Sequence, residues 1–318
     1  MSIKTIKDVS EARVDIVFVH GLETDRKSWR TEDDVFWPAT VLPKLVNNAR
    51  ILAFESDDIT VDTIWNTEDL MTDVSDELCD ELVGVRNGDV VRHPSSTRQT
   101  PFTPVVLTLF QAKRPIIFIA HCLGGLICEH ALVRAANDDD KKQVADCTLG
   151  LMLLGTPYYS PANISEATKY FRLAQQDIPS PEDLQAMSQY VLEYGQEFDQ
   201  FRQTAPLKLK IFFEGAPTKV NGEEFKVVES AVVALPDTQK QLVRIGYSHH
   251  GMSCFKDEND KEFKKIFNPL KSWLGSLPSP EEKGTVNNIS NASFAGSNNS
   301  GLQLGQNAGA LNGFSFGR

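Results

Sequence analysis

The chain has 318 residues, of which 41% are hydrophobic and 24% charged, and its formal net charge is -11. This composition is typical of globular proteins and excludes a collagen-like, fibrous or wholly disordered chain. With 43 acidic against 32 basic residues, the chain lacks the positive excess that nucleic acid needs, and its charge opposes attachment to an anionic membrane. We therefore expect one large domain or two small ones that do not bind nucleic acid.

The pattern of apolar residues favours a cytoplasmic protein. The N-terminal segment MSIKTIKDVSEARVD lacks the apolar core of a signal peptide, and no later stretch approaches the roughly 18 apolar residues of a membrane span. The five cysteines form no C-x-x-C pair, so we expect reduced thiols. Phosphate-loop, dinucleotide-binding and zinc-protease motifs are absent from the sequence, which predicts no cofactor and no metal ion.

The composition changes once along the chain. Charged residues are spread evenly as far as Lys283, whereas the following residues are rich in Asn, Gly and Ser and include one charged residue, Arg318. A short Ser- and Pro-rich segment precedes this change and is typical of a linker. The sequence therefore predicts a folded domain over residues 1–275, a linker over 276–283 and a low-complexity tail over 284–318.

Within the domain, apolar runs of strand length are separated by segments with helical spacing. We expect helices over 62–85, 125–136 and 181–203, and strands over six runs: 14–21, 49–55, 114–121, 147–155, 207–215 and 241–248. Largely apolar runs suit parallel strands that are buried on both faces. This alternation predicts an α/β fold with a mainly parallel sheet and helices on both faces.

The most informative stretch is IIFIAHCLGG, residues 116–125. A buried strand, a tight turn and a helix match the nucleophile elbow G-x-S-x-G, with Ala120 at the first glycine and Cys122 at the serine. Small residues are needed at both flanking positions because strand and helix approach closely, and a helix N-terminus favours a thiolate. The other four cysteines are expected to be structural. The stretch predicts Cys122 as a nucleophile whose turn is supported by Ala120, His121, Gly124 and Gly125.

Nucleophilic hydrolysis also needs N–H groups that stabilise the oxyanion. The first predicted strand ends in His20, Gly21 and Leu22. A turn at this strand end can supply one N–H, from Leu22, beside the N–H of Leu123 that follows the nucleophile. The alternative is that Gly21 only forms the turn and His20 packs beside it.

The base and its acid partner are expected near the ends of the last two core strands. The chain order nucleophile, acid, histidine leaves His249 and His250 as candidates for the base. Glu214 lies at the end of the preceding strand, and Glu229 in the next segment is the alternative acid. Either glutamate could instead be a solvated surface carboxylate.

Together these motifs resemble the lipase-like serine-esterase branch of the α/β hydrolases found in fungi. The resemblance covers about residues 14–270 and rests on HGL, FWP, ARIL, IFIAHCLGGLIC, LLGTP, FFEGAPT, VVESA and HHGMSCF. It implies an α/β-hydrolase fold, and it assigns the catalytic histidine to the first position of HxxMxxF, which is His249. The chain departs from the family at Cys122, where serine is usual, and at Tyr158, where the family has GTPHxG.

The tail carries a second resemblance. Residues 298–317 (NNSGLQLGQNAGALNGFSFG) are similar to the short amyloid-forming signalling motif at the C-terminus of SesB-type fungal death-pathway proteins. That resemblance implies self-assembly through the tail and a NACHT or NB-ARC receptor with a matching N-terminal motif. The composition of the tail is compatible with this assembly, because Asn and Gln can stack along a fibril and little charge opposes stacking. The alternative is a flexible tail without a partner. The regularly spaced glycines and apolar residues of the predicted motif are Gly301, Leu302, Leu304, Gly305, Gly309, Gly313, Phe314 and Phe316.

These observations predict a cell-death effector that hydrolyses an ester, lipid or thioester substrate with Cys122, His249 and Glu214. The receptor would switch it on by templating assembly of the tail, and membrane contact is expected only on activation. Two alternatives stay open: a catalytically weak or inactive hydrolase-fold scaffold in the same pathway, and a housekeeping carboxylesterase with an incidental tail.

Overall fold

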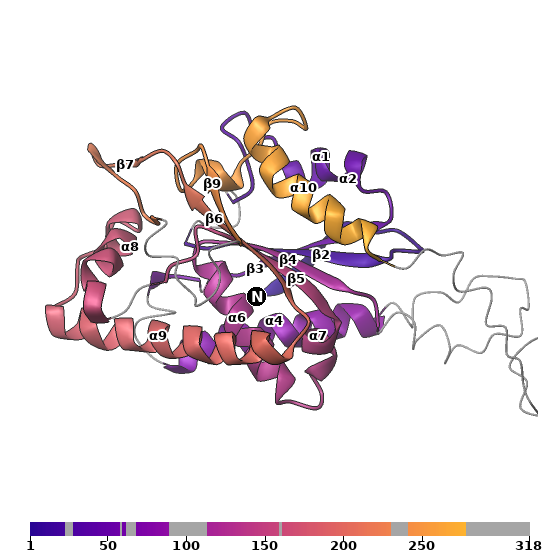
Figure 1. Cartoon of the computed structure of the whole chain (residues 1–318), viewed down its shortest axis with the longest axis horizontal. Coiled ribbons are helices and arrows are strands. Elements are labelled where there is room, and N and C mark those ends of the chain that lie inside the picture. Colours follow the sequence, from indigo (N-terminus) through magenta and orange to yellow (C-terminus); the bar gives the residue numbers. More distant parts are fainter. Residues whose placement is uncertain are drawn as a thin grey trace, which may run out of the picture. The chain divides into compact units, whose positions relative to one another are not determined.

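The computed structural model describes residues 1–22, 28–57, 59–61, 68–88, 113–158, 161–229 and 241–277. The chain divides into two units, Met1–Leu274 and Gly275–Arg318. The elements below belong to the first unit, except that the last helix ends one residue beyond it (Figure 1). The predicted tail motif at 298–317 lies outside the described residues.

One seven-stranded sheet forms the centre of the first unit. Its strands follow the order β1-β3-β2-β4-β5-β6-β9; β1 is antiparallel to β3, and every other neighbouring pair is parallel. The central strands β2 and β4 are buried along their whole length, which explains why their sequences are nearly continuous apolar runs. The strands are β1 (Ser2–Lys7), β2 (Val14–Val19), β3 (Ala49–Glu55), β4 (Ile116–His121), β5 (Thr148–Leu154), β6 (Lys208–Glu214) and β9 (Leu242–Ile245).

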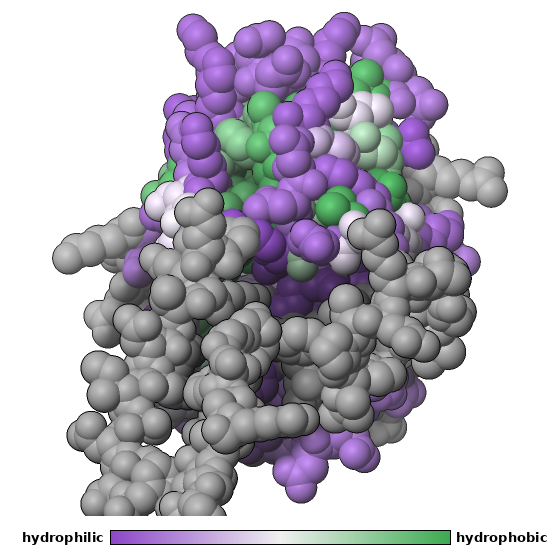
Figure 2. Space-filling model, turned by 90° about the vertical axis from the view of Figure 1, so that its right-hand side faces the viewer, coloured by the Kyte–Doolittle hydropathy of each residue, from purple (hydrophilic) through white to green (hydrophobic). Residues whose placement is uncertain are grey.

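Helices cover both faces of this sheet. Figure 1 shows α4 (Glu68–Gly88), α6 (Leu123–Ala136), α7 (Lys142–Cys147) and α9 (Pro181–Thr204) below it, and α1 (Trp37–Thr40), α2 (Leu42–Leu45) and α10 (Lys261–Gly275) above it. Figure 2 shows apolar side chains gathered in the upper part of one side, at the level of α1, α2 and α10, bordered by hydrophilic ones. The smaller elements are η1 (Pro161–Glu166), α8 (Ala167–Leu173), η3 (Gly251–Ser253) and a hairpin of β7 (Thr218–Val220) and β8 (Glu223–Phe225).

The predicted α/β architecture is confirmed, with shifted element ends. All six predicted strands are present, and β2 ends at Val19, which leaves His20 and Gly21 in the turn that follows. Two predicted helices are α6 and α9; the third is α4, and residues 62–67 of that prediction lie outside the described residues. The sequence analysis did not predict β1, the β7–β8 hairpin or α10.

A buried ion cluster joins the N-terminal ends of β2 and β3 to α4. Asp15 on β2 accepts hydrogen bonds from Arg50 at 2.8 and 3.0 Å, from Arg86 at 2.5 Å and from Arg114 at 2.9 Å. The side chain of Asp15 is 0% exposed. Burial alone would raise the pKa of Asp15, but the hydrogen bond and charge of Arg50 and the charges of Arg114 and Arg86 outweigh burial and lower it. The carboxylate therefore links β2, β3, α4 and the approach to β4.

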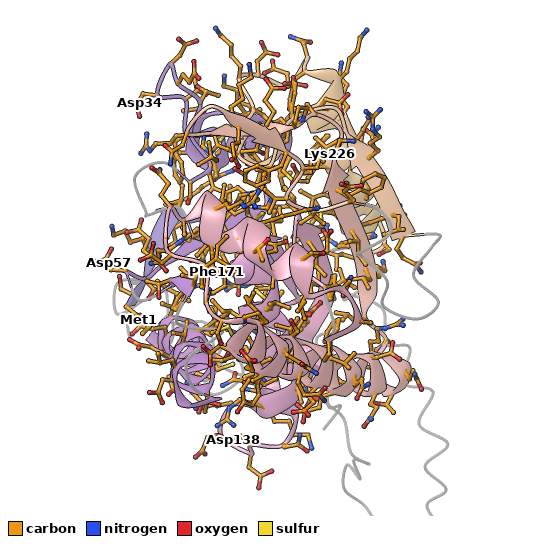
Figure 3. The ribbon with its side chains drawn as sticks, turned by 90° about the vertical axis from the view of Figure 1, so that its left-hand side faces the viewer. Met1, Asp34, Asp57, Asp138, Phe171 and Lys226 are labelled. Atoms are coloured by element: carbon orange, nitrogen blue, oxygen red, sulfur yellow. The ribbon has the colours of Figure 1, made fainter. Side chains whose placement is uncertain are left out.

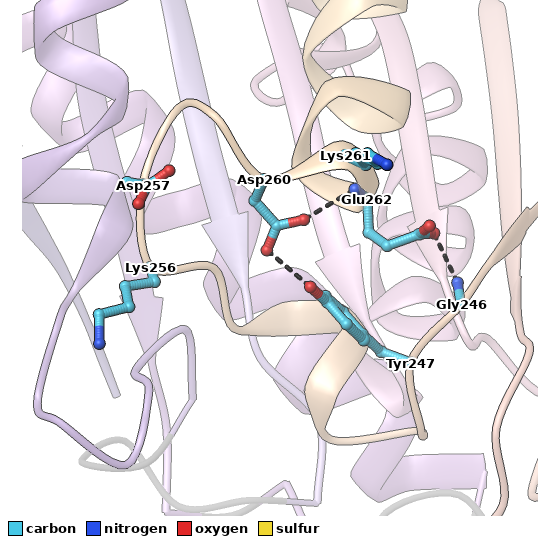
Figure 4. Close-up of a pocket in the computed structure, with 7 residues that line it drawn as sticks. All are labelled: Gly246, Tyr247, Lys256, Asp257, Asp260, Lys261 and Glu262. Atoms are coloured by element: carbon cyan, nitrogen blue, oxygen red, sulfur yellow. Dashed lines mark hydrogen bonds between the residues drawn. The ribbon is translucent and has the colours of Figure 1, made fainter.

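The start of α10 forms a shallow pocket on the upper side (Figure 4). Asp260 accepts the N–H groups of Glu262 at 2.7 Å and Phe263 at 3.3 Å, and the Tyr247 hydroxyl donates to its other oxygen at 2.8 Å. Glu262 accepts the Gly246 N–H at 2.5 Å. Asp260 therefore caps the helix N-terminus and Glu262 joins the helix to the end of β9, so the pocket is explained by the way α10 begins.

Candidate active site

Cys122 occupies the turn between β4 and α6. Its backbone angles are φ 53° and ψ -128°, a left-handed conformation that residues with a side chain rarely adopt. The Cys122 N–H donates to the carbonyl of Leu154 at 2.8 Å, and its own carbonyl accepts the Gly125 N–H at 3.1 Å. Because α6 begins at Leu123, the thiol lies at the N-terminus of a helix. The local backbone is therefore a strained strand–turn–helix.

Two glycines let the end of β2 pack directly against this turn. A Cβ added to Gly124 would lie 2.3 Å from the carbonyl oxygen of His20, and one added to Gly21 would lie 2.4 Å from the Cβ of Cys122. Both distances are shorter than any real carbon contact, so only glycine fits. A Cβ on Gly21 would also lie 3.0 Å from the backbone nitrogen of Leu123. The segment that leads into Leu22 thus lies beside the Leu123 amide, as the predicted oxyanion site requires.

His249 and Glu214 form a buried pair. The Nδ1 of His249 lies 2.9 Å from Oε1 of Glu214, and the Val228 N–H donates to the same oxygen at 2.9 Å. The Thr218 hydroxyl donates to Oε2 at 3.5 Å. An ionised Glu214 only accepts hydrogen bonds, so Nδ1 carries a proton and donates it. The Nε2 of His249 makes no hydrogen bond within the described part of the chain, which leaves it for the Cys122 side.

The electrostatic environment of His249 favours its protonated form. Burial opposes a charged imidazolium, but the charge of Cys122 and the hydrogen bond and charge of Glu214 outweigh burial and raise the pKa of His249 to about 10. A cationic imidazole beside the sulfur is the arrangement that activates a cysteine as a thiolate. The three side chains therefore form a coupled unit.

Two alternative candidates lie away from this unit. The side chain of Glu229 is 55% exposed and lies 3.7 Å from the Lys169 ammonium. The Nε2 of His250 lies 3.6 Å from the sulfur of Cys254. The structure therefore brings Cys122 together with His249 and Glu214, and it does not bring Glu229 or His250 to them.

The loop that carries His249 is held from two sides. The His121 Nε2–H donates to the carbonyl of His249 at 2.9 Å, and the two imidazole rings are 4.8 Å apart between centroids. On the other side, the Trp37 indole N–H donates to the carbonyl of Ser253 at 2.7 Å. His121 was predicted only as a support of the elbow, and the structure shows that it also contacts the histidine loop.

Thr218 and Val228 are the contacts that the sequence analysis missed. Both lie in segments that it quoted, FFEGAPT and VVESA. Both segments are among the motifs that resemble the hydrolase family, so the sequence does carry a signal for these residues. It does not show which groups are hydrogen-bonded, because the Val228 N–H donates to Glu214 from 14 residues away.

Helix α8 covers the candidate site. Figure 3 shows α8, on which Phe171 is labelled, at the centre of the side that carries Asp57 and Lys226. The Tyr170 ring meets the His249 imidazole edge-on at 6.4 Å, and ion pairs join Lys169 to Glu229 and Arg172 to Glu223. The side chains of the candidate unit are closed off from solvent: Cys122 is 1% exposed, His249 1% and Glu214 1%. A molecule from solvent therefore reaches the sulfur only after the covering side chains move.

Two kinds of feature are absent from the described ranges. Among those residues, no group of three or more His, Cys, Asp or Glu side chains is arranged to hold a metal ion. Equally, none of the described helices combines the length and apolar character that a bilayer crossing demands.

The sheet order, the antiparallel edge strand, the sharp turn from β4 into α6 and the histidine after the last strand define the α/β-hydrolase class. The chain has the α/β-hydrolase fold. Its C-terminal residues 286–313 match the family model described as the SesB domain on fungal death-pathway protein. Fold and match together support a SesB-type α/β hydrolase, which confirms the resemblance seen in the sequence.

Two curated proteins are similar in sequence. Protein SERAC1 of Danio rerio is 24% identical over 286 residues, which are 83% of this chain and 39% of that protein. Protein SERAC1 of Homo sapiens is 22% identical over 260 residues, which are 74% of this chain and 35% of that protein. The chain thus spans less than half the length of these relatives.

Solved structures of hydrolases are also similar to this chain. The siderophore hydrolase EstB from Aspergillus fumigatus matches with a TM-score of 0.47 and 12% identity, over 85% of this chain and 92% of that one. The lipase BlEst2 of Bacillus licheniformis matches with a TM-score of 0.41 and 13% identity, over 86% and 97%. The α/β-hydrolase assignment rests on the strand order and on the turn at Cys122.

Proposed function

We propose that this protein hydrolyses ester or thioester bonds with Cys122 as nucleophile, His249 as base and Glu214 as the acid that orients the base. One observation carries the proposal: a cysteine in a strained turn at a helix N-terminus beside an imidazole whose other nitrogen is bound by a buried carboxylate. The helix terminus and the imidazolium both stabilise a thiolate. The Glu214 bond holds the imidazole in one orientation and balances its charge.

The reaction proceeds in two steps. His249 takes the proton of the Cys122 thiol, and the sulfur attacks the carbonyl carbon to form a tetrahedral oxyanion. Collapse expels the alcohol or thiol, which receives the proton from Nε2 of His249, and leaves an acyl group on the sulfur as a thioester. His249 then takes a proton from water, the hydroxide attacks the thioester, and the carboxylic acid leaves as the sulfur regains its proton.

The oxyanion of both steps needs N–H donors that are already in position. We assign this role to the backbone N–H groups of Leu123 and Leu22. The first stands at the start of α6, where N–H groups are not used inside the helix. The close approach of Gly21 to the Leu123 nitrogen supports the second.

The tail would control this chemistry. We infer that residues 286–313, which match the SesB domain, stack as an amyloid when a NACHT or NB-ARC receptor with a matching motif templates them, and that stacking gathers the hydrolase domains into a cell-death effector. The composition of the tail supports stacking, because it lacks repelling charge. The cytoplasmic location, and membrane contact only on activation, stay predictions.

Turnover by the full chain tests the chemistry. Wild type should hydrolyse short-chain p-nitrophenyl esters and thioesters, and iodoacetamide should label its nucleophile. Cys122→Ala should lose both turnover and that label, whereas Cys254→Ala, which removes a thiol from the histidine loop, should keep both. Equal turnover by wild type and Cys122→Ala would remove Cys122 from the mechanism.

The burial of the Cys122 sulfur, which is 1% exposed, favours one other candidate, an inactive hydrolase-fold scaffold. If the domain is an inactive scaffold, Cys122→Ala should kill cells to the same extent as wild type when the tail assembles. The hydrolase predicts that killing is lost with the thiol.

Fibre formation tests the tail. The full chain should form thioflavin-positive fibres with a reflection near ~4.7 Å along the fibre axis. A chain that ends at Lys283 should stay monomeric under the same conditions. A full chain that never forms such fibres, even when a tail peptide is added as a seed, would contradict the proposed switch.

A further inference from the structure

Thr218 stands between the two members of the buried His–Glu pair. It begins β7, four residues after Glu214, and is 7% exposed. Its Oγ1 accepts the backbone N–H of His249 at 3.0 Å, and its hydroxyl donates to Oε2 of Glu214 at 3.5 Å. One short side chain thus contacts the main chain of the histidine and the carboxylate that orients it.

These two bonds restrain the pair in ways that the Nδ1–Oε1 bond does not. Oε1 of Glu214 accepts hydrogen bonds from His249 Nδ1 and from the Val228 N–H, whereas Oε2 accepts one from the Thr218 hydroxyl. With both oxygens bound, the carboxylate cannot rotate about its terminal bond. The bond to the His249 N–H fixes the backbone from which the imidazole extends.

The Thr218 hydroxyl can serve both members of the pair at once. A threonine hydroxyl has one proton to donate, and here one of its lone pairs is used by the His249 N–H. Its proton is directed at Oε2, and that bond needs an oxygen that accepts.

We propose that Thr218 is a positioning residue of this hydrolase, whose hydroxyl holds His249 and Glu214 in the register that presents Nε2 to the Cys122 sulfur. This inference rests on the proposed function. Thr218 acts through His249 and Glu214 and does not touch the substrate. The competing role is structural, in which the side chain only fills its space and closes the turn before β7.

Two substitutions distinguish the contribution of the Thr218 hydroxyl from that of the side-chain shape. Thr218→Val keeps the branched shape and removes the hydroxyl, and Thr218→Ser keeps the hydroxyl and removes a methyl group. In the full chain, Thr218→Val should lower kcat about 10- to 100-fold with KM within about twofold, because it misaligns the base without removing a substrate contact. Thr218→Ser should restore kcat to within about threefold of wild type.

The pH profile adds a readout that a structural role does not move. Glu214 helps to keep His249 protonated, so a loosened carboxylate lets the pKa of His249 fall from about 10. The alkaline limit of kcat in Thr218→Val should therefore shift to lower pH than in wild type, and Thr218→Ser should keep the wild-type limit. Urea unfolding of each variant reports any loss of stability separately.

A double-mutant cycle with Glu214→Gln completes the test, and Thr218→Ala replaces Thr218→Val if that variant does not fold. If Thr218 acts through the carboxylate, its loss should cost much less in the Glu214→Gln background than in wild type. Additive losses, an unchanged pH limit, or equal losses in Thr218→Ser and Thr218→Val would each overturn the positioning role. A wild type without turnover would instead overturn the proposed function, and the inference would fall with it.

Discussion

Glu129 gives the sharpest test of the packing behind the candidate site. It lies on α6 and is 0% exposed, and its carboxyl group accepts a hydrogen bond from the Tyr158 hydroxyl. Its second oxygen has no hydrogen-bond partner among the described residues. Burial raises the pKa of Glu129 from 4.5 to about 8, against the hydrogen bond from Tyr158 and the charge of Arg202, which lower it. The folded domain therefore holds this carboxyl protonated at neutral pH.

The raised pKa makes stability fall as pH rises. Between pH 4.5 and 8 the unfolded chain releases the Glu129 proton and the folded chain keeps it, so folding costs more with each pH unit. The cost is about 1.4 kcal/mol per unit, or roughly 3 kcal/mol by pH 7. Glu129→Gln keeps the shape and can still accept the Tyr158 hydrogen bond, but it has no proton to release.

Urea unfolding followed by tryptophan fluorescence measures this difference. Near pH 5 the free energies of unfolding of wild type and Glu129→Gln should agree to within about 1 kcal/mol, since this pH lies close to the ordinary pKa of 4.5 and the unfolded chain has only begun to gain from releasing the proton. At pH 7 the variant should be more stable by about 3 kcal/mol. If the difference between the two free energies of unfolding stayed constant from pH 5 to 8, Glu129 would be charged in the folded domain and the reasoning would be wrong.

Three further outcomes follow from contacts described above. Alkylation of Cys122 by iodoacetamide should change little between pH 6 and 9, because the pKa of His249 is about 10; a rate that rises about tenfold per unit, as for a free thiol, would contradict the coupled pair. Gly124→Ala should cost more than about 2 kcal/mol or abolish folding, whereas the helical control Gly84→Ala, which meets nothing within 4 Å, should stabilise by up to about 1 kcal/mol. Asp15→Asn should cost about 3–5 kcal/mol in thermal or urea unfolding, because it leaves buried guanidinium groups without their carboxylate.

The parts of the fold that were predicted depend on local patterns. The IIFIAH run and the glycines after Cys122 specify a strand, a turn and a helix within about ten residues, so the α/β class and the order of these elements follow from neighbouring positions. In α10, Phe263, Ile266, Leu270 and Trp273 have helical spacing and are buried. Pro269 within that run removes a backbone donor and obscures the pattern. Strand β1 was missed because its residues are only partly buried at the sheet edge.

The candidate site needed the fold as well as the pattern. Residues alone left Glu214 and Glu229 open as the acid, since both lie near strand ends. Contacts between distant parts of the chain distinguish the two glutamates. Glu214 is hydrogen-bonded to His249, which is 35 residues away, whereas Glu229 forms an ion pair with Lys169. The hydroxyl of Thr218 joins chain segments 31 residues apart, which no spacing rule predicts.

The cover over Cys122 has a consequence for the chemical durability of the protein. A sulfur nucleophile has a weakness that a serine oxygen lacks, since oxidation beyond the sulfenic acid destroys it for good. Cys122 is 1% exposed, so the side chains that cover it slow the access of peroxide to its sulfur as well as the access of any larger molecule. The enclosure would therefore protect the proposed nucleophile from irreversible oxidation until the covering side chains move.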